Sequence, residues 1–130
     1  MEYAKLGKSG IEVSRLCVGC MSFGRPSEDF HEWTLNPNET EEIVKKALDL
    51  GINFFDTANT YSHGTSEEYL GRALKKNIAR NKVVIGTKVY FNEGHLSKEA
   101  VRREIDGSLK RLGTDYVDLY IIHRFDYTTP

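Results

Sequence analysis

The chain has 130 residues, a net charge of -1 and an apolar content of 39%. This length allows one domain with a core of its own, and the composition is typical of a soluble globular protein rather than a disordered one. The near-neutral charge gives no electrostatic reason to expect nucleic acid or an anionic membrane as a partner. There is no long apolar run and no signal-peptide pattern after Met1, so we expect a cytoplasmic location.

The first predicted elements are a small β-hairpin, a strand and a helix. Short extended runs flank Gly7 to Gly10, whose residues are typical of a turn, so residues 3–13 are predicted to form the hairpin. A strand is predicted at 15–21, followed by a loop at 24–37. The first helix is predicted to begin at Asn38, with Glu41 completing a capping box, and to end at Gly51.

The rest of the chain alternates strands with helices and ends on a strand. Strands are predicted at 53–56, 82–88 and 116–123, where apolar residues run together. One helix is predicted to start near Thr65, with Glu68 in the box position, and another to be capped by Ser97 and ended by Gly113. This order predicts an α/β fold with parallel strands that are covered on both faces.

Cys17 and Cys20 form a C-x-x-C pattern, which can indicate a redox or a metal site. A zinc site needs about four ligands, and no second pair of cysteines or spaced histidines follows. A thioredoxin-type pair needs its first cysteine at a helix N-terminus. Here both residues fall on a predicted strand, where positions three apart face opposite sides. We therefore expect two reduced thiols and no metal.

Three ionisable residues of different kinds end successive predicted strands, namely Asp56, Lys88 and His123, and Tyr61 follows Asp56 closely. Ligands bind at the carboxyl ends of parallel strands, so we expect these side chains on one rim. A tyrosine, whose ordinary pKa is near 10, becomes a better general acid beside a lysine that a carboxylate holds in place. The set suits protonation of a carbonyl oxygen, with a hydride supplied by a cofactor.

Two motifs resemble the signature of the aldo-keto reductase family. They are Asp56-Thr57-Ala58-x-x-Tyr61 and Gly64-x-Ser66-Glu67-x-x-Leu70-Gly71. The segments Leu6 to Gly10, Thr87-Lys88 and Ile122-His123-Arg124 resemble other conserved parts of that family. Phe23-Gly24, the loop with Trp33 and the stretch from His123 to Tyr127 look most like its bacterial branch, which is related to potassium-channel β subunits.

The resemblance implies a (β/α)8 TIM barrel that uses NADP(H) to reduce a small-molecule carbonyl substrate. It implies Tyr61 as the proton donor, with Asp56 and Lys88 tuning it and His123 orienting the carbonyl. The cofactor would lie against Gly19, Cys20 and Met21 and approach Asp56. Many relatives have Thr-Trp where this chain has Cys20-Met21, so main-chain contacts are expected there rather than side-chain contacts.

Simpler interpretations of the same residues stay open. Lys88 could be a Schiff-base lysine of an aldolase-type barrel, or it could form only a structural ion pair with Asp56. His123 alone could be a structural histidine. Trp33 could be a lid over the substrate or could simply pack within its loop.

The predicted elements make up only part of a barrel. A (β/α)8 barrel typically needs about 250 residues, whereas this chain supplies four strands and three helices of the N-terminal half as one partial domain, 1–130. Its edge strands would be open, which favours self-association. We expect a fragment that is inactive alone because most of the cofactor site lies elsewhere. The alternatives are a non-catalytic half-barrel and a regulatory or binding module.

Overall fold

The computed structural model describes all 130 residues and begins with a separate two-stranded sheet. Strand β1 (Tyr3–Lys5) pairs antiparallel with β2 (Glu12–Ser14), which confirms the predicted hairpin. The side chain of Asn53 accepts a hydrogen bond from Ser14 N at 2.7 Å and donates one to the Glu12 carbonyl at 3.1 Å. The hairpin is thereby attached to the segment that enters the second strand of the main sheet.

The main sheet contains four parallel strands that follow one another in sequence order. They are β3 (Val18–Gly19), β4 (Phe54–Asp56), β5 (Val84–Val89) and β6 (Leu119–Ile122). In the register of the sheet, Gly19 lies opposite Asp56, and Asp56 lies opposite Gly86. The carboxyl ends of all four strands therefore meet along one edge, as the sequence predicts.

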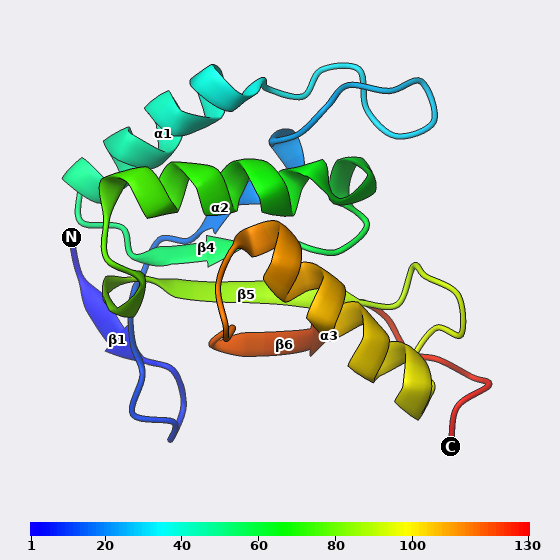
Figure 1. The fold of residues 1–130 in the computed structure, drawn as a ribbon. Helices are drawn as coiled ribbons and strands as arrows, with labels where there is room; N and C mark the ends of the chain where they lie inside the picture. The colour runs from blue at the N-terminus through cyan, green and yellow to red at the C-terminus, as the bar shows by residue number, and fades with distance from the viewer.

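The three long helices lie on one face of this sheet (Figure 1). They are α1 (Pro37–Asp49), α2 (Thr65–Asn77) and α3 (Lys98–Leu112). Right-handed crossovers between strands in sequence order place successive helices on the same side. The core between helices and sheet contains Phe23, Val44, Phe55, Leu70 and Ile85, all at most 2% exposed. The prediction of helical cover on both faces is therefore wrong for these residues.

Two boundaries differ from the sequence-based prediction near the start of the sheet. The first strand is much shorter than 15–21, because a 3-10 helix, η1 (Cys20–Ser22), begins directly after Gly19. Helix α1 begins before Asn38, since Asn36 caps it and Pro37 occupies its first position. Asn36 Oδ1 accepts from Glu39 N at 2.9 Å, and the Glu39 carboxylate accepts from Asn36 N at 3.0 Å. A capping box is present, but it is shifted by two residues.

The other helix ends are partly as predicted. Helix α2 starts at Thr65, but no side chain caps it, because a 3-10 turn, η2 (Tyr61–Gly64), leads straight into it. Ser97 caps α3 through Ala100 N at 3.2 Å, and Gly113 ends it at a φ of 70°, both as predicted. A third 3-10 turn, η3 (Arg80–Lys82), delays the start of β5. None of the helices has both the length and the apolar character needed to span a bilayer.

Candidate active site

Lys88 lies at the centre of a polar cluster at the carboxyl edge of the sheet. Its Nζ donates to Asp56 Oδ2 at 2.7 Å, to the Thr57 carbonyl at 2.9 Å and to Tyr61 Oη at 3.2 Å. These three bonds use all the donors of an ammonium group. The Lys88 side chain is only 15% exposed, so the position of its charge is closely defined. The structure thus brings Asp56, Tyr61 and Lys88 together, as the sequence predicts.

The surroundings of Lys88 keep it protonated. Burial lowers its pKa, but the hydrogen bonds and charges of Asp56 and Tyr61 outweigh this effect and raise the pKa above its ordinary value. The ammonium nitrogen also lies 4.9 Å from the centroid of the Tyr61 ring. A lysine with a raised pKa is a poor nucleophile, because a Schiff base requires the free amine. This electrostatic setting is unsuited to the aldolase-type role.

His123 follows β6 and lies on the other side of Tyr61. The two ring centroids are 5.7 Å apart and the rings are nearly perpendicular, at 89°. His123 Nδ1 is buried and has no hydrogen-bond partner. Burial lowers the pKa of the imidazole, and the charges of Lys88 and Arg124 lower it further. His123 is therefore a neutral imidazole at neutral pH, with one N–H to offer.

Tyr61 and His123 line an open pocket of about 250 Å³ whose other walls are mostly aromatic or apolar. The remaining lining residues are Met21, Phe30, His31, Thr60 and Phe91. The Phe30 ring lies 6.4 Å from the Tyr61 ring, so the loop before α1 contributes to this wall. Trp33 does not line the pocket; it is 56% exposed and stacks on His31 at 4.5 Å. Of the two predicted roles for Trp33, the structure favours packing within its loop.

Phe30, His31 and Phe91 belong to no motif in the sequence, which predicts only a loop position for His31. Phe30 and His31 belong to the long loop after the first strand, and Phe91 follows the third strand. Aromatic residues just beyond strand ends were the available signal, since such loops form the binding face of parallel α/β folds. That signal does not say which loop residues turn toward the pocket.

The predicted cofactor contacts differ in what they present to solvent. Gly19 is exposed, and nothing lies within 4 Å of the position where a Cβ would stand. Met21 is 40% exposed and lines the pocket. The Cys20 side chain is fully buried in the core, and its carbonyl accepts from Ser66 Oγ at 2.6 Å. Of the four predicted cofactor contacts, three therefore present an accessible side chain or accessible main chain at the rim. These three are Gly19, Met21 and Asp56.

Both cysteines are free thiols, as predicted. Partial burial and the nearby charge of Asp56 raise the pKa of Cys17 to about 11, and burial raises the pKa of Cys20 as well. Neither thiol is activated, because a reactive cysteine needs a lowered pKa.

A buried polar network lies beneath the cluster, on the helix side of the sheet. Glu67 is 0% exposed and accepts from Thr87 Oγ1 and from Arg111 Nε, both at 2.8 Å. Thr57 Oγ1 and Ser66 Oγ lie 2.9 Å apart, also fully buried. Glu67 and Ser66 appear in the sequence as parts of a motif, without a role. Glu67 lies at a position of α2 that faces the core, and charged residues are almost never fully buried unless they are paired. This pattern in the sequence was the available sign of a structural carboxylate.

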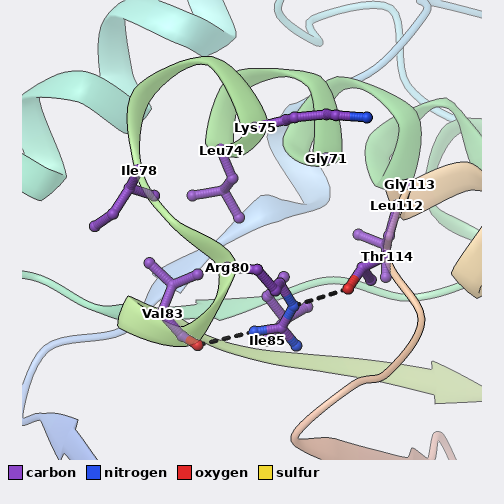
Figure 2. Close-up of a pocket in the computed structure, with 10 residues that line it drawn as sticks. All are labelled: Gly71, Leu74, Lys75, Ile78, Arg80, Val83, Ile85, Leu112, Gly113 and Thr114. Carbon is purple, nitrogen blue, oxygen red and sulfur yellow. Dashed lines mark hydrogen bonds between the residues drawn. The ribbon is translucent and has the colours of Figure 1, made fainter.

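A second hollow, of about 280 Å³, lies between α2 and α3 at the opposite end of β5 (Figure 2). Its walls include Leu74, Ile78, Val83 and Leu112. The guanidinium of Arg80, at the base of the hollow, already donates hydrogen bonds to Thr114 Oγ1 at 3.0 Å and to the Val83 carbonyl at 3.0 Å. The hollow contains no cluster of acid and base groups. The candidate active site is therefore the cluster at the carboxyl ends of the strands.

Consecutive parallel strands carry an aspartate, a lysine and a histidine at their carboxyl ends, with a tyrosine in the next loop, and this edge is where ligands bind in α/β barrels. The sequence model of the Aldo/keto reductase family matches residues 15–130. The chain belongs to this family of oxidoreductases, which confirms the family resemblance.

Two curated relatives illustrate the range of the family. Versiconal hemiacetal acetate reductase of Aspergillus parasiticus is 43% identical; the match covers 100% of this chain and 44% of the relative. A probable voltage-gated potassium channel subunit beta of Oryza sativa subsp. japonica is 37% identical, with 100% of this chain and 39% of the relative covered. The chain thus spans less than half the length of the curated relatives it matches.

Solved structures agree with the fold. A thermostable aldo-keto reductase crystallised with the inhibitor epalrestat superposes with a TM-score of 0.84 at 34% identity, covering 100% of this chain and 45% of that one. An aldo-keto reductase from Klebsiella pneumoniae in complex with NADPH gives 0.74 at 30% identity, covering 90% and 38%. The four parallel strands therefore correspond to the N-terminal part of an aldo-keto reductase barrel, as the sequence predicts.

Proposed function

We propose that the complete protein is an NADPH-dependent oxidoreductase that reduces aldehyde or ketone carbonyls to alcohols. In this proposal, the present residues supply the proton-transfer side of the site. The observation that carries it is the bridge from Asp56 through Lys88 to Tyr61, with distances of 2.7 Å and 3.2 Å. A purely structural ion pair would not need the third partner, a phenol that opens on a pocket.

Each side chain has a distinct role in the proposal. Tyr61 gives its phenolic proton to the carbonyl oxygen as that oxygen gains negative charge. Lys88, held by Asp56, remains protonated and stabilises the phenolate that forms. His123 is neutral and uses its single N–H to hold and orient the carbonyl oxygen. The aromatic walls of the pocket provide an apolar surface beside the reacting carbon.

The exposed part of the rim fits a nicotinamide cofactor. Gly19 leaves open space for close approach to the main chain, and Met21 presents an apolar surface beside the pocket. Asp56, opposite Gly19 in the sheet, adds an acceptor for a hydroxyl group. When bound, the cofactor supplies the hydride. The NADPH complex of the Klebsiella pneumoniae relative supports the choice of cofactor.

The test is Tyr61→Phe in the complete protein that contains these residues. We expect the kcat for an aromatic aldehyde to fall by roughly 100-fold or more, because the general acid is lost. The dissociation constant for NADPH, measured by fluorescence, should stay within about threefold, since only one hydroxyl is removed.

The matched control is Tyr69→Phe on α2, whose hydroxyl forms no hydrogen bond and lies outside the pocket. It should leave kcat near the parent value. Unchanged turnover in Tyr61→Phe would refute Tyr61 as the acid. Turnover of no carbonyl compound by the parent protein would favour a regulatory role, for which the rice channel subunit is a precedent within the family.

A further inference from the structure

Arg124 follows His123 directly and packs on Phe91, which lines the pocket, while Arg124 itself is exposed and lies just outside the lining. Its Cζ lies 4.7 Å from the centroid of the Phe91 ring and 5.6 Å from that of Tyr90. The Phe91 ring is itself 5.0 Å from the His123 imidazole and lines the pocket. The guanidinium and the imidazole therefore contact the same aromatic ring. A guanidinium packed on aromatic rings is held in position without losing its hydrogen-bonding capacity.

No protein group uses that capacity. Arg124 forms no ion pair and donates no side-chain hydrogen bond, whereas Arg80 pairs with Asp118 and Arg111 pairs with Glu67, both at 2.8 Å. Asp126 is the acid closest in sequence, and its carboxylate is occupied by Leu96 N and the hydroxyls of two threonines. Among residues 1–130, all five N–H donors of Arg124 are therefore without a partner.

The charges around the pocket favour an anion. None of the residues that line it is acidic. The charge of Lys88 is balanced by Asp56 at 2.7 Å, and His123 is neutral at pH 7. The positive charge of Arg124 is therefore uncompensated beside the aromatic wall. A negatively charged substrate meets no repulsion from the lining and is attracted to this side.

We propose that Arg124 is a specificity residue that binds a carboxylate of the substrate, so that the enzyme prefers carbonyl compounds carrying a carboxylate on the far side of an aromatic or similarly sized apolar group. This inference rests on the proposed function and names its substrate class. The planar guanidinium matches a carboxylate in a two-bond arrangement, while the carbonyl lies between Tyr61 and His123.

The test compares two substrates of nearly equal shape in the complete protein with NADPH. They are 4-carboxybenzaldehyde and its neutral methyl ester, methyl 4-formylbenzoate. We expect the parent protein to have the higher kcat/KM for the acid. In Arg124→Gln, the acid-to-ester ratio of kcat/KM should fall about tenfold. A tenfold change corresponds to the loss of one exposed hydrogen bond between charged groups. Arg124→Lys keeps the positive charge but loses the planar guanidinium that can form two parallel bonds to a carboxylate. This variant should retain part of the acid-to-ester ratio of kcat/KM.

Arg102→Gln on α3 is the matched control, since Arg102 is exposed and forms no ion pair, as is true of Arg124, but packs on no aromatic ring. It should leave the acid-to-ester ratio unchanged. A ratio near one in the parent protein, or an equal loss for both substrates in Arg124→Gln, overturns the role of Arg124 and leaves carbonyl reduction intact. Absence of turnover with both compounds in a protein that reduces other aldehydes overturns this inference alone, whereas absence of turnover with every aldehyde and ketone tested overturns the proposed function as well.

Discussion

Arg111 Nε lies 2.8 Å from Oε1 of Glu67, a carboxylate that is completely buried. The other oxygen of Glu67 accepts from Thr87, the residue before Lys88 on β5. Successive residues of a strand face opposite sides, so Thr87 points to the helices and Lys88 to the other face. The Glu67–Arg111 pair therefore joins α2, β5 and α3 directly behind the residue at the centre of the candidate site.

Removing one member of this pair should cost stability. In Arg111→Met, the carboxylate of Glu67 stays buried without its counter-charge, so we expect the free energy of unfolding in urea to fall by about 3 kcal/mol. This is the lower end of the range for broken buried pairs, because the Arg111 side chain is 27% exposed. Adding Glu67→Gln removes the unpaired charge and should recover part of the loss. A loss below about 1 kcal/mol in the single variant would mean that the pair is not effectively buried.

Gly71 permits the close approach of α2 and α3. A Cβ at this position would collide with the main-chain carbonyl of Leu112, which cannot move without displacing the end of α3. Gly71→Ala should therefore lower the free energy of unfolding by about 1–3 kcal/mol, although alanine is the better helix former.

Gly107→Ala is the control for Gly71, since it also lies inside a helix. There the nearest atom is Arg111 Nη1 at 3.1 Å, which has to shift by only a few tenths of an ångström. We expect a much smaller change in urea unfolding. Equal effects of the two substitutions would contradict the steric explanation.

The neutral state of His123 predicts a pH dependence of stability. Burial and the charges of Lys88 and Arg124 lower its pKa in the folded protein. In the unfolded chain the imidazole takes up a proton near its ordinary pKa of about 6.5, whereas the folded protein does so only at lower pH. The unfolded state thus binds more protons between the two values. The contribution of His123 to stability should be fully present above about pH 6.5 and should be lost as the pH drops toward the folded pKa.

The measurement is urea unfolding at a series of pH values, with His123→Gln as the reference that lacks this group. The difference between the two proteins should shrink or reverse as the pH is lowered. A proton NMR titration of His123 gives a second check, because Arg124→Gln removes one of the lowering charges and should move the pKa back toward its ordinary value. A pH-independent difference would show that His123 titrates alike in both states.

Much of the architecture follows from local patterns in the sequence. The turn at Gly7 to Gly10, the cap at Ser97 and the stop at Gly113 each depend on residues within a few positions, and the structure confirms them. The sequence predicts the capping box of α1 at Asn38 and the structure has it at Asn36, because both asparagines have a glutamate three residues later. The positive φ of Gly64, which replaces a side-chain cap at α2, depends on how η2 turns and is not visible in the motif.

The sequence by itself determined the family, the order of strands and helices, and the rim on which Asp56, Tyr61, Lys88 and His123 would meet. These follow from short motifs and from the nearly equal length of each strand–helix unit, which brings every strand end to the same edge. Only the tertiary structure decided that Lys88 bonds to both Asp56 and Tyr61, that Glu67 is buried against Arg111, and that Phe91 stands between His123 and Arg124. Such contacts depend on strand register and helix packing, which are set by interactions between residues far apart in the chain.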